Sequence, residues 1–175
     1  MAQKESRDAL QMLADDHRTV EALFEKYDNA RGEAAQQKIV QQICQELTIH
    51  AMVEEQVFYP AIREAVDDDM MDEAQVEHDS AKTLILSLQQ GTPSDAYYDA
   101  KVSVLKEQVE HHVYEEERQR GSIFAQVRKA DIDLVALGAQ MAELKQQLLA
   151  QAKAEGLPRP VRSARQRDQF GPGMT

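Results

Sequence analysis

The sequence predicts an all-α fold, an up-down-up-down four-helix bundle with an additional C-terminal helix. Three observations support this class. Apolar residues recur at intervals of three and four over five long stretches, which is the spacing of an amphipathic helix. No segment shows the sustained alternation of a β-strand. The breaks between the stretches are short, so consecutive helices are expected to pack as antiparallel neighbours.

The first two helices are expected at residues 6–29 and 33–66. Ser6 is the expected N-cap of the first helix, whose apolar stripe contains His17. Pro60 falls inside the pattern of the second helix and should kink or end it, because proline removes a backbone donor and clashes with the preceding turn.

The third helix is expected at residues 70–90, with His78 on its inward stripe. Gly91 begins a clear break, and Ser94 is the expected N-cap of the fourth helix, which carries His112.

After the fourth helix, the sequence pattern changes at two points. A disturbance is expected at Gly121, and a fifth helix is expected at residues 131–154, after which Arg, Pro and Gly become frequent. The expected organisation is one domain over residues 1–155, the bundle with its C-terminal helix, and a flexible tail over residues 156–175.

Composition and charge exclude several classes of partner. The chain has 175 residues, a net charge of −11 and a single cysteine, Cys44. An acidic surface argues against nucleic acid and anionic membranes, and no apolar run reaches the roughly 18 residues of a membrane span. The N-terminal residues lack the apolar core of a signal peptide, and one cysteine suits a reducing compartment. We therefore expect a cytoplasmic protein, and no protein partner is indicated.

A repeated pentapeptide carries the candidate chemistry. HAMVE in the second helix recurs as HVYEE in the fourth. Residues four apart lie on one face of a helix, so each copy aims one imidazole and one carboxylate at the same point. With one inward histidine on each of the other two helices, the bundle can build a two-metal site. The expected ligands are His17, His50, Glu54, His78, His112 and Glu116.

The fourth helix offers two registers, because His111 and Glu115 also lie four residues apart. The residues seven and three positions before His50 are apolar, and the same offsets from His112 again reach apolar residues. From His111 they reach one valine and one glutamine. This comparison favours His112 and Glu116, and the pair His111 and Glu115 stays the alternative.

The cost of burial favours a metal over a salt-bridged core. An unpaired buried carboxylate costs several kcal/mol, and no Lys or Arg lies on the predicted inward stripes. A pair of cations shared by both carboxylates removes that cost. Imidazole and carboxylate donors without a thiolate fit iron or manganese and also admit zinc. Asp16 and Asp79 are expected to point elsewhere and Glu77 to lie on the surface, with an added role for Glu77 or a tyrosine left open.

Four segments around these residues carry a resemblance to a known family: LADDHRTVEALFEKY, ICQELTIHAMVEEQVFYP, EAQVEHDSAKTLILSL and VEHHVYEEE. Together with a later helical segment they span most of residues 10–150, and they resemble the hemerythrin-like family, the proteins with an HHE cation-binding domain. The resemblance implies a non-haem centre of two iron ions, oxo- or hydroxo-bridged, with Glu54 and Glu116 bridging the metals. Manganese and zinc are the alternatives to iron.

Two positions depart from the family pattern. Oxygen-carrying hemerythrins have a second histidine one turn before the ligand of the third helix, where this chain has Ala74. The six-ligand set therefore looks more like that of iron-sensing and iron–sulfur-repair relatives. After Glu117 the family usually runs quickly into an apolar-Phe-Pro end, whereas residues 118–122 intervene here, either as a helix irregularity or as a loop.

The expected function is a di-iron protein that binds or reacts with O₂, NO or peroxide in sensing, storage or stress defence. One alternative is a di-iron enzyme that consumes peroxide or repairs iron–sulfur clusters. Another is an iron-responsive or structural metal-binding module. No general acid or base besides the ligands is identifiable, so no catalytic residue is assigned.

Overall fold

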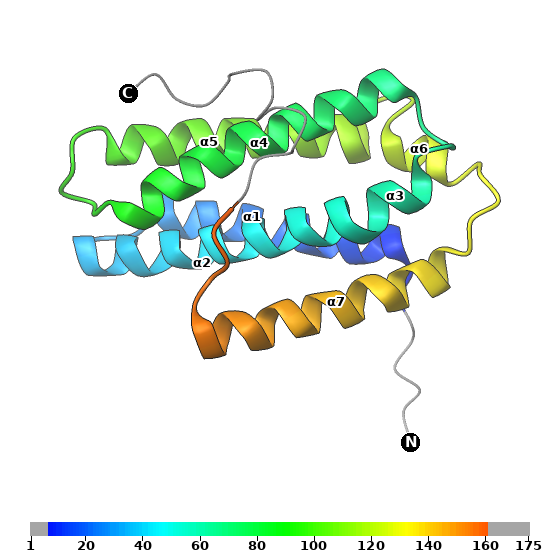
Figure 1. Ribbon diagram of the computed structural model, residues 1–175. Coiled ribbons are helices and arrows are strands. Elements are labelled where there is room, and N and C mark those ends of the chain that lie inside the picture. Colours follow the sequence, from blue (N-terminus) through cyan, green and yellow to red (C-terminus); the bar gives the residue numbers. More distant parts are fainter. Residues whose placement is uncertain (1–6, 161–175) are drawn as a thin grey trace, which may run out of the picture.

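Five long helices make up most of the computed structural model, which describes residues 7–160 (Figure 1). No strand occurs in that part of the chain. The all-α bundle with an additional C-terminal helix is therefore confirmed. The long helices are α1 (Ala9–Asp28), α2 (Glu33–Val53), α4 (Asp68–Gln90), α5 (Tyr98–Val113) and α7 (Leu134–Glu155).

The helices are arranged in three layers (Figure 1). α1 and α2 form one antiparallel pair, α4 and α5 form a second pair above it, and α7 packs on α1 and α2 from below. Gly138 of α7 permits a close approach to the start of α1, because a Cβ there would lie 2.6 Å from the carbonyl oxygen of Arg7. None of the described helices is both long and apolar enough to cross a bilayer.

Both helices that carry the pentapeptide contain a π turn, in which a backbone N–H bonds to the carbonyl five residues earlier. α2 continues through η1 (Glu54–Phe58) into α3 (Tyr59–Ile62), with the N–H of Tyr59 bonded to the carbonyl of Glu54. The irregularity predicted at Pro60 therefore begins ahead of it. Proline has no N–H to continue the regular pattern, and the wider turn accommodates this.

α5 continues into the second π turn, η2 (Tyr114–Arg118), and the helical backbone ends at Gln119. Ser122 then caps the short helix α6 (Ile123–Val127) by accepting the N–H of Ala125. The departure from the family pattern after Glu117 is therefore both an irregularity and a loop.

Both predicted N-caps differ from the structure. The carboxylate of Asp8 caps α1 by accepting the N–H of Gln11 at 2.8 Å, and Ser6 lies outside the described residues. Ser94 does not cap α5, which begins only at Tyr98. An earlier turn takes precedence there, because the Asp95 carboxylate accepts the N–H of Thr92 at 2.7 Å.

Polar side chains divide the buried core into two apolar clusters. Along α1, Leu13 belongs to the first cluster and Val20 to the second, with His17 between them. Along α2, Val53 and Leu47 flank His50 in the same way. The expected ligands therefore lie midway along the bundle, with apolar packing on either side.

α7 ends at Glu155, and the division into a domain over residues 1–155 and a flexible tail stays a prediction. Most of the tail predicted over residues 156–175 lies outside the described residues.

Candidate metal centre

All six side chains that the sequence singles out meet between the two apolar clusters. Each is buried, and Glu54 and Glu116 are completely so. The competing register is not inward, because the side chain of His111 is 59% exposed. The six residues come from α1, α2, α4, α5 and the two π turns: His17, His50, Glu54, His78, His112 and Glu116.

The four imidazoles fall into two pairs. The rings of His17 and His50 lie 4.9 Å apart, and so do those of His78 and His112. We call these the His17–His50 half and the His78–His112 half. The imidazoles of the first half form one group of possible ligands with Glu54 and Glu116, and those of the second half form another with Glu54. Within each group, the ligand atoms all lie within 4.8 Å of one another. Each group has the size and the donor set of a single cation site.

Each glutamate connects the two halves, because every imidazole turns its Nε2 atom inward. Glu54 lies 3.1 Å from His50 Nε2 and 3.2 Å from His78 Nε2. Glu116 lies 3.4 Å from His17 Nε2 and 3.7 Å from His112 Nε2. A carboxylate placed between two imidazoles in this way can share its oxygens between two ions.

The Nδ1 atom of every imidazole faces a further carboxylate on its outer side. Such partners hold a ligand histidine in one orientation and one tautomer. We call these four groups the outer carboxylates. The nitrogen–oxygen distances are 3.1 Å for His17 and Glu117, 3.6 Å for His50 and Asp16, 2.9 Å for His78 and Glu55, and 2.8 Å for His112 and Glu77.

Three of the outer carboxylates are in turn paired with a cationic side chain. Glu117 contacts Arg18 at 2.6 Å, Asp16 contacts Lys145 at 2.5 Å and Glu55 contacts Lys82 at 2.6 Å. Lys145 belongs to α7, so the additional helix contributes a charge to the centre. Within residues 7–160 the fourth, Glu77, has only the exposed imidazole of His111 behind it, at 3.4 Å.

These contacts correct three expectations. Asp16 points toward the centre, because it faces the imidazole on the neighbouring helix. Glu77, expected on the surface, is only partly exposed and holds His112. Lys82 is a buried cation, 5% exposed, although no inward cation was predicted. It neutralises Glu55 and lies 3.3 Å from Asp79, which is itself buried.

The carboxylates around the imidazoles control their protonation. Burial alone would lower the pKa of His50, but the charges of Glu54 and Asp16 raise it to about 10. Burial also opposes the charged form of His78, and the neighbouring Glu54 and Glu55 raise its pKa to about 9. Against its own burial, Glu54 has a pKa held well below its usual range by the two imidazoles. Protons and cations therefore compete for the same nitrogen atoms.

The donors at the middle of this cluster fit a cation. Six inward-facing nitrogen and oxygen atoms of the expected ligands are buried and make no hydrogen bond within the described part of the chain, both carboxylate oxygens of Glu54 among them. An unsatisfied buried polar atom is costly. Atoms that approach one another at 3.1–3.7 Å without hydrogen-bond geometry are instead placed to share an ion.

Tyr59 adds a hydroxyl group to the centre. Its oxygen lies 3.4 Å from His78 Nε2 and 3.4 Å from Glu116 Oε1. Burial, together with the negative charges of Glu116 and Glu54, raises the pKa of Tyr59 well above its ordinary value. The hydroxyl therefore keeps its proton and can donate it in a hydrogen bond.

A cavity of about 50 Å³ borders the imidazoles on the side of the second apolar cluster. Its walls combine all four histidines with apolar side chains such as Val20, Leu47 and Val109. A space of this size and polarity suits a small uncharged molecule beside the metal ligands.

Comparison with known proteins agrees with this arrangement. The family described as the hemerythrin HHE cation binding domain matches residues 8–124. A solved structure of a hemerythrin HHE cation binding domain-containing protein from Mycobacterium kansasii is 24% identical and has a TM-score of 0.69. The alignment covers 86% of this chain and 94% of that one, and it shows the same fold.

A curated relative is similar in sequence over part of its length. The protein, a DNA nickase from Nostoc sp., is 30% identical over 113 residues, which are 65% of this chain and 31% of the relative. The chain therefore spans about a third of the length of that relative.

Proposed function

Because the chain belongs to the hemerythrin HHE cation-binding domain family, we propose that it holds two iron ions and binds or reacts with O₂, NO or peroxide. The proposed ligands are the two imidazoles of each half with Glu54 and Glu116 between them. Such a centre serves sensing, storage or defence against oxidative and nitrosative stress. When bound, iron with open positions supplies redox chemistry and coordination of small molecules.

One observation carries this proposal, the convergence of buried atoms without hydrogen-bond partners on the middle of the bundle. The outer carboxylates support it, because they direct four Nε2 atoms to the same place. Imidazole with carboxylate and no nearby thiolate supports iron, and manganese or zinc would suit the same donors. The cavity supports a small uncharged ligand, since its wall is largely apolar.

Metal analysis of the protein, purified and then loaded with ferrous iron without oxygen, tests the metal. We expect about two ions per chain, as in two-metal sites of this kind, and a visible absorption change when NO or O₂ is added. His50→Ala should lose at least one ion, and His111→Ala is the matched control because it removes an exposed imidazole. A final iron content that is the same in both variants would refute the ligand set.

Tyr59 favours a second candidate, an enzyme that consumes peroxide. Its protonated hydroxyl between His78 and Glu116 can donate a hydrogen bond to an oxygen of a bound substrate. Tyr59→Phe should then lower peroxide turnover by about 100-fold, within the range that one hydrogen-bond donor to a developing charge contributes, with iron content unchanged. Peroxide turnover equal to that of the unmodified protein would exclude this role.

DNA nicking is not part of the proposal. That name belongs to a relative of which the chain spans 31%. The net charge of −11 also repels a phosphate backbone. A small-molecule ligand therefore accounts better for the centre.

A further inference from the structure

A second group of potential cation ligands lies at the surface beside the buried centre. His111 Nε2 is 3.4 Å from Glu77 Oε1 and 3.4 Å from Glu115 Oε1. The donor atoms of these three residues lie within 4.8 Å of one another. We call the three residues the outer cluster. One imidazole and two carboxylates form a donor set that suits a divalent ion of the first transition series.

Glu77 contacts both the outer cluster and the buried centre. Its Oε1 atom faces His111 in the outer cluster, while its Oε2 atom lies 2.8 Å from His112 Nδ1 at the buried centre. One carboxylate therefore spans the distance between an exposed imidazole and a buried one.

A small cavity of about 20 Å³ joins the outer cluster to the buried centre. Glu77 and Glu115 line it on the outer side, and His112 and Glu116 line it on the inner side. Glu116 is completely buried, and neither its Oε2 atom nor His112 Nε2 has a hydrogen-bond partner among the described residues. Ala74 forms part of the wall and leaves this space open. The volume admits about one water-sized particle.

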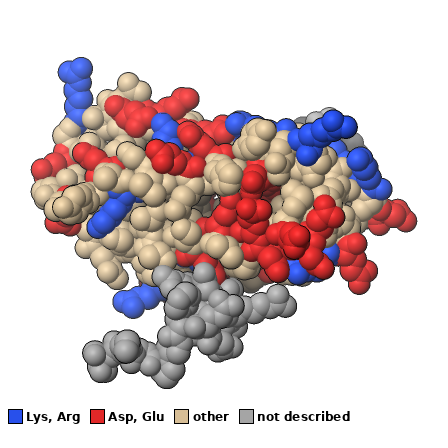
Figure 2. Space-filling view, turned by 90° about the horizontal axis from the view of Figure 1, so that it is seen from above, with Lys and Arg blue, Asp and Glu red and all other residues tan. Residues whose placement is uncertain are grey.

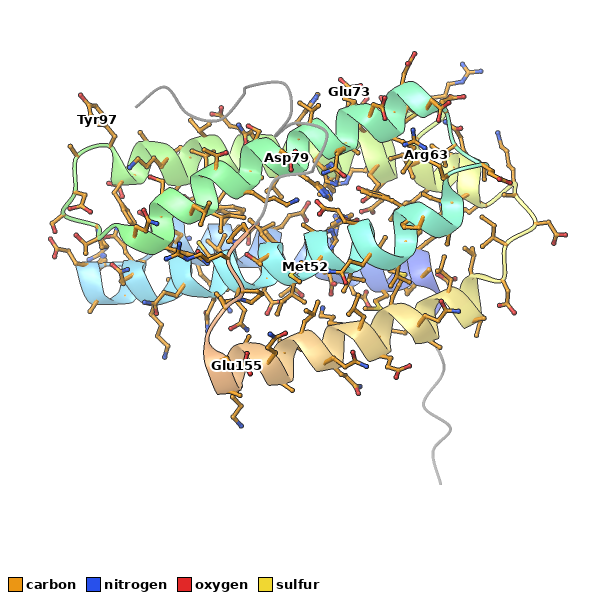
Figure 3. All side chains as sticks on the ribbon, viewed as in Figure 1. Met52, Arg63, Glu73, Asp79, Tyr97 and Glu155 are labelled. Carbon is orange, nitrogen blue, oxygen red and sulfur yellow. The ribbon has the colours of Figure 1, made fainter. Side chains whose placement is uncertain are left out.

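The charge around this cavity favours a cation. Acidic side chains gather over the face that α4 and α5 present (Figure 2). Glu73, on the outer side of α4 (Figure 3), lines the cavity with Glu77 and Glu115. Of the described residues that line it, none is Lys or Arg. The other three outer carboxylates each contact a cationic side chain. Among the described residues, Glu77 is the outer carboxylate without a Lys or Arg partner.

We propose that the outer cluster captures ferrous iron from solvent and transfers it through this cavity to His112 and Glu116. The inference rests on the proposed function and adds the route by which the centre is loaded. The ion exchanges water and the donors of Glu77, His111 and Glu115 for those of the buried centre. Its oxidation state does not change, and no bond within the protein breaks.

The test measures how fast the metal-free protein takes up ferrous iron in the absence of oxygen. Samples are mixed rapidly with ferrous salt, quenched with a chelator after increasing times, and assayed for retained iron. The test variant is His111→Gln with Glu115→Gln, which leaves Glu77 and the six buried ligands in place. The control is Glu107→Gln, which removes the same single negative charge from an exposed position on α5.

We expect the double variant to load about tenfold more slowly, the lower end of what electrostatic focusing contributes, and to reach the same final iron content. The control should load at the rate of the unmodified protein. Equal rates in all three proteins would overturn the proposal, and so would an equal slowing in the control. A lower final iron content in the double variant would also overturn it, because the outer residues would then hold resident ions. If the unmodified protein retains no iron, the proposed function fails as well, which separates the two failures.

Discussion

The two halves of the centre differ in what lies behind their histidines. In the His17–His50 half, both outer carboxylates are paired with a cation, Arg18 for Glu117 and Lys145 for Asp16. In the His78–His112 half, buried Lys82 neutralises Glu55, whereas Glu77 faces an exposed imidazole. We call the first half closed, because a cation contacts each of its outer carboxylates, and the second half open, because Glu77 has no Lys or Arg partner among the described residues. A site with equivalent inner ligands can therefore be asymmetric in the charge that surrounds it.

Removing a group common to both halves should have the largest effect. Glu54 lies between His50 and His78. Glu54→Gln is therefore expected to lower the affinity for both ions by more than about 100-fold, beyond what loss of an outer partner costs. The iron content after loading and desalting measures this. Two retained ions in the variant would show that the halves do not depend on a shared carboxylate.

Lys82→Met tests the buried cation of the open half. The change leaves Glu55 without its ammonium partner in a largely buried place, and we expect a loss of about 3 kcal/mol in the free energy of unfolding. Urea denaturation of the metal-free protein measures it. A variant as stable as the unmodified protein would mean that solvent compensates Glu55.

Glu117→Gln tests the orientation of His17 in the closed half. The amide still fills the space but loses the charge that faces Nδ1, and we expect about tenfold weaker binding of one ion. Competition with a chelator of known affinity gives the ratio. If the affinity for both ions falls equally, the two halves do not bind their ions independently.

Lys145→Met should have the smallest effect, although its partner Asp16 also faces a ligand histidine. Lys145 is 21% exposed, so water can replace it, and we expect a loss of about 1 kcal/mol in the free energy of unfolding. The same urea measurement compares it with Lys82→Met. A loss larger than that of Lys82→Met would mean that the cation of the His17–His50 half stabilises the fold more than the cation of the His78–His112 half.

The inner side of the centre could be predicted from the sequence, and the outer side could not. Helical periodicity alone orients His50 and Glu54, because both lie on one helix at a fixed spacing. The contact of His78 with Glu55 joins two helices, and it depends on how those helices are rotated against each other. Lys82 was missed for a related reason, since a long side chain at the edge of a stripe can reach inward. Each outer carboxylate is the sequence neighbour of an expected ligand, which was the available signal, but the direction of its side chain could not be read from the sequence.

The π turn at Glu54–Phe58 also sets the phase of the chain that follows it. A π turn holds about one residue more than an α turn, and one residue corresponds to about 100° of rotation around the helix axis. With this extra residue in place, the side chains of Phe58, Tyr59 and Ile62 are buried. Deleting a single residue there would give a regular helix and turn this aromatic and aliphatic face away from the core. The length of the segment is therefore as much a part of the centre as the identity of Glu54.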